Sequence, residues 1–236
     1  IMPSLVGSEM CIRDRQRAQD IPYLPIRFFK SHTIQSFKGK PVKTFTSSGT
    51  TTSINAQHHL ADLSNYRASF QACFEQFYGK PKDWAILALL PSYLEREGSS
   101  LIYMMDSLIA QSKNEHSGFY LDDLAKLNAL LLELEQQKQP TLLLGVSFAL
   151  LDFTEQYSLN LSSTTVMDTG GMKGRRKELT REELHKTLQK GFGVSAIHSE
   201  YGMTELLSQA YAKGDGRFHC PNSVSYTHLT LPTTPY

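Results

Sequence analysis

Short apolar segments alternate with segments of helical periodicity along most of this chain, and the alternation restricts the fold more than any other feature. Four segments have the length and apolar character of short buried strands: 84–90 (WAILALL), 141–146 (TLLLGV), 164–167 and 194–197. Segments whose apolar residues recur at helical spacing precede or separate them: 60–77, 121–134, 148–157 and 180–189. This order predicts an α/β fold with a mostly parallel sheet covered by helices, which binds ligands at the carboxyl ends of its strands.

Local signals set several boundaries. Gly79 and Pro81 predict the end of the first helix, and Thr180 with Glu183 has the spacing of a capping box. Two prolines and an aromatic pair in 20–29 predict an extended segment that docks on the rest of the protein.

Charge and cysteine content exclude several function classes. The net charge of +1 offers no global attraction to nucleic acid or to an anionic membrane. No apolar run reaches the roughly 18 residues that span a bilayer. Three cysteines without metal-like spacing favour a reducing compartment such as the cytoplasm, so any function is expected to come from a local site.

The residues at the two ends of the chain indicate that these ends are not part of a natural protein. Residues 10–15 can be written as ATG TGT ATA AGA GAC AG plus one base, and the reverse complement of that string encodes 224–228 in a shifted frame. An inverted repeat that brackets an insert is expected from a translated sequencing adapter. We therefore expect 1–15 and 223–236 to be adapter-derived and 16–222 to be a fragment of a longer protein.

A hydroxyl-rich segment is the first candidate site. Residues 46–53 hold seven hydroxyl side chains around Gly49, which suits a phosphate-binding loop, although solvated loops often share this composition. The segment lacks the Lys of the common P-loop.

Two further candidate sites follow strand segments. Gly170 and Gly171 would let a flat ligand approach the backbone, although a tight turn is the simpler interpretation. Farther along, Tyr201 offers a stacking face, Thr204 a hydroxyl donor and Glu205 a hard oxygen ligand for Mg²⁺. His198 and Cys73 are interpreted as packing residues rather than as a catalytic base and a nucleophile.

In combination these segments resemble the adenylate-forming superfamily, and within it the LuxE-type acyl-protein synthetases. The ordered segments that carry the resemblance are 21–30 (IPYLPIRFFK), 45–51 (FTSSGTT), 89–96 (LLPSYLER), 169–175 (TGGMKGR) and 200–205 (EYGMTE). The resemblance implies the parallel-sheet core of the N-terminal domain of such an enzyme, without its C-terminal lid.

The resemblance also implies roles for individual residues. A phosphate-binding loop for ATP would comprise Thr46, Ser47, Ser48, Gly49, Thr50 and Thr51. Gly170, Gly171, Tyr201 and Gly202 would line the adenine site. Thr204 and Glu205 would be catalytic, with Thr204 contacting the α-phosphate and Glu205 binding Mg²⁺.

The implied reaction is ATP-dependent activation of a carboxylate, expected to be a fatty acid, as an acyl-adenylate that is transferred to a protein thiol. A ligase resembling phenylacetate-CoA ligase, with CoA as the acceptor, and a non-catalytic nucleotide-binding module are the alternatives. Thr52 replaces the Gly that usually continues the loop. The ribose-binding Asp, the lid Lys and the acyl-carrying thiol are expected beyond Asn222, so this fragment is expected to be inactive by itself.

Overall fold

A mostly parallel six-stranded sheet forms the centre of the protein. The computed structural model describes residues 24–47, 54–90, 98–172 and 176–221. The strand order is β4-β3-β5-β6-β7-β8, and the antiparallel pairing of β7 with β8 is the exception to the parallel pairing. The strands are β3 (Ala85–Leu89), β4 (Gly118–Phe119), β5 (Thr141–Val146), β6 (Thr164–Thr169), β7 (His198–Gly202) and β8 (Gln209–Ala212). The prediction of an α/β fold with a mostly parallel sheet is confirmed.

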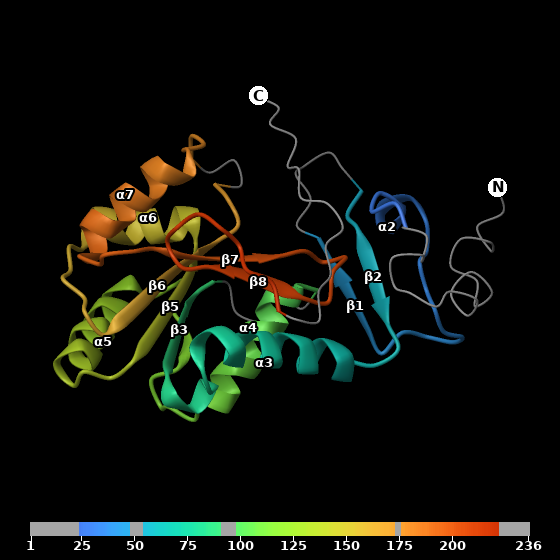
Figure 1. Cartoon of the computed structure of the whole chain (residues 1–236), viewed down its shortest axis with the longest axis horizontal. Helices are drawn as coiled ribbons and strands as arrows, with labels where there is room; N and C mark the ends of the chain where they lie inside the picture. The colour runs from blue at the N-terminus through green and yellow to red at the C-terminus, as the bar shows by residue number, and fades with distance from the viewer. Residues whose placement is uncertain (1–23, 48–53, 91–97, 173–175, 222–236) are drawn as a thin grey trace.

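Helices cover both faces of this sheet. In Figure 1, α6 (Ser147–Gln156) and α7 (Arg181–Phe192) lie on one side of the sheet, and α3 (Ser64–Tyr78) and α4 (Ser100–Ser112) lie on the other. The remaining helices of the described chain are α2 (Phe28–Ser31), α5 (Leu124–Gln136) and the 3₁₀ turn η2 (Pro81–Asp83). None of the described helices is both long and apolar enough to cross a membrane.

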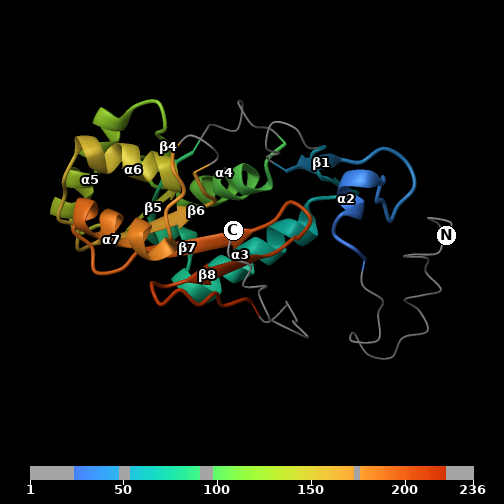
Figure 2. The ribbon, with the colours of Figure 1, turned by 90° about the horizontal axis from the view of Figure 1, so that it is seen from above.

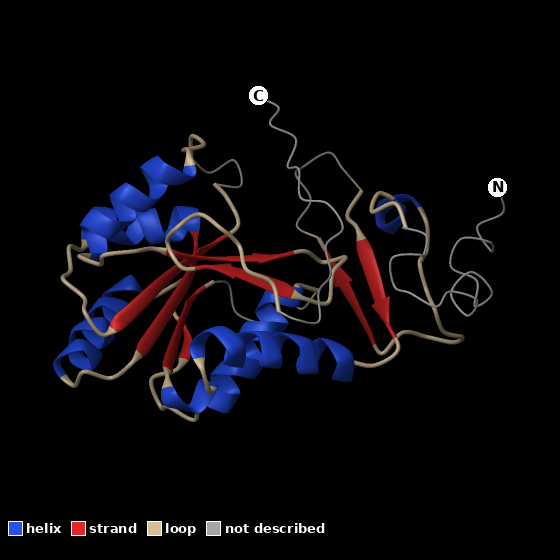
Figure 3. Cartoon of the chain, in the orientation of Figure 1, coloured by secondary structure: helices blue, strands red, loops and turns tan. Residues whose placement is uncertain are grey.

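A second, two-stranded sheet lies beyond one end of the main sheet. Strands β1 (Lys43–Thr46) and β2 (Gln57–Leu60) pair antiparallel, with Thr46 opposite Gln57. Figures 1 and 2 show β1 and α2 at the same end of the molecule, and Figure 3 shows the β1–β2 pair apart from the main sheet. The hydroxyl-rich segment begins at Thr46, the last residue of β1, so β1 places the start of that segment at the end of the large sheet.

The hydrophobic core is built from the apolar segments of the sequence. Every residue of β3 and β5 is buried, which the sequence predicts for strands covered by helices on both faces. Aromatic side chains of α3, among them Tyr66, Phe70 and Phe74, join this core from one side. Phe153 of α6 stacks on Phe192 of α7 on the other side, with ring centroids 5.4 Å apart.

Two helix boundaries confirm the local sequence signals. The capping box at α7 is present: the Thr180 side chain accepts from the Glu183 backbone N–H, and the Glu183 carboxylate accepts from the Thr180 backbone N–H. Helix α3 ends at Gly79, whose φ of 79° is open to glycine but strained for other residues.

Two expectations need correction. The fourth strand does not occupy 194–197: β7 begins at His198, because pairing with β6 starts with Met167 opposite His198. The segment predicted to be extended includes the short helix α2, in which the His32 N–H bonds to the Phe28 carbonyl.

Candidate functional site

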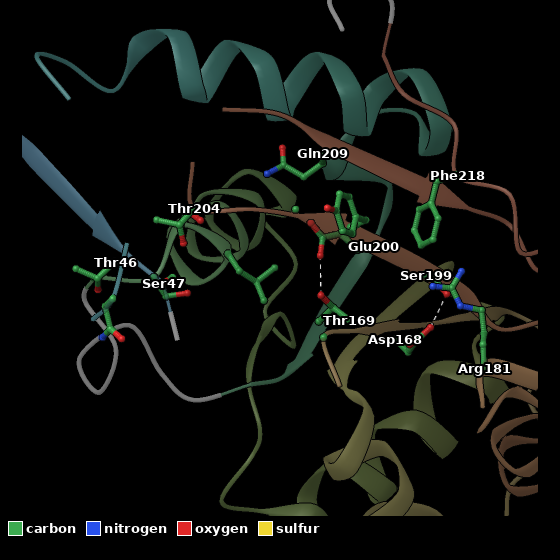
Figure 4. Close-up of a pocket in the computed structure, with 18 residues that line it drawn as sticks. Thr46, Ser47, Asp168, Thr169, Arg181, Ser199, Glu200, Thr204, Gln209 and Phe218 are labelled. Carbon is green, nitrogen blue, oxygen red and sulfur yellow. Dashed lines mark hydrogen bonds between the residues drawn. The ribbon is translucent and has the colours of Figure 1, made fainter. Parts of the chain in front are cut away.

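A cavity of about 600 Å³ opens at the carboxyl ends of β6 and β7. Figure 4 shows residues from β1, β6, β7, β8 and the start of α7 around it. Its walls also include the N-terminal end of α4. The lining residues are Thr46, Ser47, Asn55, Gly98, Ser99, Ser100, Leu101, Asp168, Thr169, Gly170, Arg181, Ser199, Glu200, Tyr201, Gly202, Thr204, Gln209 and Phe218.

One wall joins the end of β1 to the start of α4. The Thr46 N–H donates to the Gly98 carbonyl at 2.8 Å, and the Ser47 Oγ accepts from the Ala56 N–H at 2.9 Å. Ser99 caps α4, because its side chain accepts from the Ile102 N–H. Hydroxyl groups and the N-terminal end of a 13-residue helix therefore face the same cavity, an arrangement that attracts anions.

A buried carboxyl group forms part of the opposite wall. Glu200 on β7 is 6% exposed, and the Thr169 hydroxyl on β6 donates to its Oε2 at 2.6 Å. Burial raises the pKa of Glu200 to about 7, with a smaller contribution from the negative charge of Asp168, although the Thr169 hydrogen bond opposes the rise. A substantial fraction of Glu200 therefore carries a proton at neutral pH.

Asp168, Ser199 and His185 form a hydrogen-bonded cluster beside Glu200. The Ser199 hydroxyl donates to Asp168 Oδ1 at 2.6 Å, and His185 Nε2 lies 3.2 Å from the same oxygen. His185 Nε2 also lies 3.3 Å from Ser199 Oγ. The shorter bond directs the Ser199 proton to the aspartate, whereas in a nucleophilic triad the histidine would accept it. The cluster holds β6, β7 and α7 together and does not activate Ser199.

Aromatic and cationic side chains form the rim. Tyr201 is 47% exposed, and its ring centroid lies 5.8 Å from that of Phe218. The Arg181 guanidinium lies over the Phe218 ring at 4.7 Å. Arg181 is the one lysine or arginine among the cavity-lining residues of the described chain. The rim thus offers a flat stacking surface next to a positive charge.

Thr204 and Glu205 lie in the turn between β7 and β8. The Thr204 carbonyl accepts from His58 Nδ1 of β2 at 3.0 Å, which ties the turn to the small sheet. Burial lowers the pKa of His58, although the bond to Thr204 and the charge of Glu205 oppose the shift. His58 is therefore neutral at pH 7, with its proton on Nδ1, because a carbonyl can only accept.

The structure brings together half of the residues that the sequence nominated. Six of them line the cavity: Thr46, Ser47, Gly170, Tyr201, Gly202 and Thr204. Gly171 and Glu205 do not line it: Gly171 is exposed, and Glu205 is half-buried beside His58. Ser48, Gly49, Thr50 and Thr51 lie outside the described residues. The roles assigned to all of these residues stay predictions.

His198 and Cys73 could have acted as a catalytic base and a nucleophile, but in the structure both are packing residues. His198 Nδ1 lies 3.0 Å from the Tyr78 hydroxyl, and His198 does not line the cavity, which agrees with the packing interpretation. Cys73 is fully buried, and burial raises the pKa of its thiol to about 12. Such a thiol is unreactive at neutral pH.

Several lining residues were not nominated from the sequence. Gly98, Ser99 and Ser100 had a detectable signal, because serines directly before an apolar-periodic segment are typical of a helix start. Glu200 lies inside the EYGMTE segment but was assigned no role. Arg181, Gln209 and Phe218 carry no local signal, since only the tertiary fold brings them to the cavity.

The fold and the cavity define an α/β protein with a polar site, suited to an anionic ligand, at the carboxyl ends of parallel strands. Within the described ranges, no group of three or more His, Cys, Asp or Glu side chains could hold a metal ion by itself. No family model matches the chain, and no curated protein sequence matches it.

Two solved structures do match. One is coronafacic acid ligase from Pectobacterium brasiliense, with a TM-score of 0.44, 19% sequence identity, and coverage of 66% of this chain and 29% of the ligase. The other is a single-residue mutant form of that ligase, with a TM-score of 0.35, 24% identity, and coverage of 56% of this chain and 24% of the ligase. The matched region thus spans less than a third of the ligase.

Proposed function

We propose that this chain is the nucleotide-binding part of an ATP-dependent ligase that activates a carboxylic acid as an acyl-adenylate. One observation carries the proposal. The hydroxyls at the end of β1, the N-terminal end of α4, the Gly170 strand end and the Tyr201–Thr204 segment share one cavity of about 600 Å³. That volume is in the usual range for a site that binds a small molecule.

The cavity has complementary places for the two ends of ATP. Thr46, Ser47 and Ser99 supply hydroxyl groups beside a helix N-terminus, which suits phosphate oxygens. At the other side, the exposed ring of Tyr201 and the bare backbone of Gly170 suit a flat base. The predicted phosphate contacts of residues 48–51 belong to the same proposal.

Magnesium fits this site as an ion held mainly by the nucleotide. Mg²⁺ is usually bound through one or two carboxylates plus substrate phosphates and water. Glu205 is the carboxylate that we assign to it, because Glu205 follows the cavity-lining Thr204 directly. The ion would neutralise phosphate charge as the two anionic substrates approach one another.

The chemistry follows from holding two anions in line. A carboxylate oxygen attacks the α-phosphorus of ATP, a new carbon–oxygen–phosphorus anhydride forms, and the bond from the α-phosphorus to the bridging oxygen breaks to release pyrophosphate. Thr204 would donate a hydrogen bond to the α-phosphate, and Arg181 would attract the anionic substrates. A thiol then attacks the acyl carbon, and AMP leaves.

We propose a protein thiol as the acceptor and a fatty or related acid as the substrate, as in the acyl-protein synthetases that the sequence resembles. Cys73 is a poor candidate for that thiol, since it is buried and its pKa lies at about 12. CoA is the alternative acceptor. Incubation with labelled acid and ATP separates them, because label on a protein supports the first and an acyl-CoA product supports the second.

A nucleotide-binding module without turnover is the second candidate. Its supporting observation is that Glu205 does not line the cavity. A binder of this kind would hold ATP tightly, and its affinity would survive the substitution Glu205→Ala.

Equilibrium binding of ATP tests the proposed site. The wild-type chain is expected to bind ATP, and Thr204→Ala is expected to weaken binding. Thr187→Ala is the matched control, because Thr187 is an exposed residue of α7 whose hydroxyl bonds within its own helix. No ATP binding by the wild type, or equal binding by both variants, would contradict the placement of the nucleotide.

A further inference from the structure

One hydrogen bond joins the turn after β7 to the small sheet. Nδ1 of His58 on β2 lies 3.0 Å from the carbonyl oxygen of Thr204, and the two residues are 146 positions apart in the sequence. Because a carbonyl can only accept, Nδ1 carries the proton and donates it. Thr204 lines the cavity, so this bond fixes a peptide group at the edge of the candidate site.

A backbone hydrogen bond closes the turn between β7 and β8. The Leu206 N–H donates to the Met203 carbonyl at 3.0 Å. The Leu206 side chain is 40% exposed, so it does not anchor the turn on the core. The Thr204 carbonyl takes no part in the bond that closes the turn. Donation from His58 is therefore an independent constraint on the position of Thr204.

His58 is itself held in a fixed place. Strand pairing sets it opposite Phe45, and residues opposite each other in a ladder face the same side of a sheet. Phe45 is fully buried, and its ring centroid lies 5.5 Å from that of Tyr66 on α3 and 5.7 Å from that of Tyr103 on α4. The Phe29 ring meets the His58 ring edge-on, with centroids 5.1 Å apart. The imidazole can thus act as a rigid link between the two parts of the fold.

The small sheet also positions the hydroxyl groups that we propose to bind phosphate. Thr46 is the last residue of β1 and pairs with Gln57, the neighbour of His58. Figure 4 shows Thr46, Ser47 and Thr204 on the same side of the cavity. One pair of strands therefore sets the start of the hydroxyl-rich segment and, through His58, the position of Thr204.

We propose that His58 is a positioning residue for binding of the nucleotide phosphates. This inference rests on the proposed function, in which Thr204 contacts the α-phosphate. Donation from Nδ1 holds the Thr204 carbonyl, and thereby the Thr204 hydroxyl, in a fixed place relative to the hydroxyls of β1. Hydrogen bonds weaken steeply when their distance or angle is poor, so this placement matters for the phosphate contact. His58 does not line the cavity and acts through Thr204.

Two substitutions separate the hydrogen bond from the bulk of the ring. The amide nitrogen of asparagine is bonded to Cγ, as Nδ1 of histidine is, so His58→Asn can keep the donation to Thr204. The amide nitrogen of glutamine lies one bond farther out and corresponds to Nε2, so His58→Gln loses the donation. In equilibrium binding to the full chain, His58→Gln is expected to weaken ATP about tenfold, whereas His58→Asn is expected to bind ATP nearly as the wild type does.

Adenosine is the second ligand, because it has no phosphates. Its affinity is expected to be the same in the wild type and in both variants, whereas a general disturbance of the cavity would weaken adenosine and ATP together. The substitution Thr204→Ala tests the route of the effect. In that background His58→Gln is expected to cause little further loss of ATP affinity, because the hydroxyl that His58 positions is already gone.

His59→Gln is the matched control. His59 follows His58 on β2, faces the other side of the small sheet, and its Nδ1 lies 2.8 Å from the Thr44 hydroxyl of β1. Its loss is expected to leave ATP affinity unchanged. A thermal melt verifies that each variant is folded.

Three results would overturn the inference: unchanged ATP binding in His58→Gln, an equal loss in His59→Gln, or a tenfold loss in a folded His58→Asn. The last of these keeps the test decisive if His58→Gln does not fold. No ATP binding by the wild type would contradict the proposed function itself, whereas wild-type binding that His58→Gln leaves unchanged contradicts this inference alone.

Discussion

The Thr46 N–H donates to the carbonyl of Gly98 at 2.8 Å, and this bond joins the end of β1 to the start of α4. The approach is so close that a Cβ at position 98 would lie 2.5 Å from Thr46 Oγ1. Two segments separated by about fifty positions thereby form one wall of the cavity. The proposed nucleotide site depends on this contact, because it sets the hydroxyls of β1 beside the helix N-terminus.

Gly98→Ala is expected to destabilise the protein by roughly 1–3 kcal/mol, because Thr46 must move to admit the methyl group. Chemical denaturation measures the change. Gly118→Ala is the control, since its Cβ would meet Tyr120 at ordinary contact distance. The double variant Gly98→Ala with Thr46→Ala should regain part of the loss, and additive effects of the two substitutions would contradict the contact.

Glu200→Gln is expected to change how stability depends on pH. The folded-state pKa of Glu200, about 7, lies above the ordinary value of 4.5, so the folded protein binds more protons than the unfolded chain between these values. This group therefore contributes a loss of stability as pH rises from about 4.5 through 7. The difference in unfolding free energy, variant minus wild type, should increase over that range, and a flat difference would contradict the buried protonated carboxyl.

His58→Gln is expected to reduce sensitivity to acid. Burial lowers the pKa of His58 below 6.5, so the unfolded chain binds a proton more readily, and stability contributed by the neutral ring is lost as pH falls below 6.5. Unfolding free energies of the variant should fall less steeply between pH 7 and 5 than those of the wild type, measured against the exposed His32→Gln. Parallel curves for the wild type and His58→Gln would show that His58 does not stay neutral in the folded state.

Arg181→Gln is expected to weaken ATP binding about tenfold while leaving the melting temperature nearly unchanged. Arg181 is the cation of the cavity lining, and its guanidinium packs on the Phe218 ring at the rim. Arg217→Gln removes an exposed charge that is not in the lining and serves as the control. Equal loss of affinity in the two variants would mean that net charge, rather than the position of Arg181, attracts the nucleotide.

The central sheet could be predicted because its signals are local. The apolar run of β5 has the predicted bounds, and the capping box at Thr180 sets the start of α7. The start of β7 could not be predicted, because Glu200 and Gln209 are polar yet buried, and pairing between strands rather than apolar character defines β7 and β8. Burial of polar residues in a sheet leaves no periodic pattern in the sequence.

Only those parts of the candidate site that have a local sequence signal could be predicted. Thr46, Gly170 and Tyr201 lie in segments whose composition indicates a nucleotide site, and the cavity contains all three. Arg181 and Gln209 reach it through the packing of α7 and the pairing of β8 with β7, which a linear motif does not encode.

Carboxylate-dependent exchange of labelled pyrophosphate into ATP tests the central claim most directly, because exchange requires reversible formation of an acyl-adenylate. It is measured with the longer protein from which we propose this chain derives, because this chain is expected to be inactive by itself, against a panel of fatty, hydroxylated and aromatic acids. The account predicts exchange that needs both ATP and an acid and that falls sharply in Thr204→Ala but not in Thr187→Ala. ATP binding without exchange for any acid in the longer protein would contradict it.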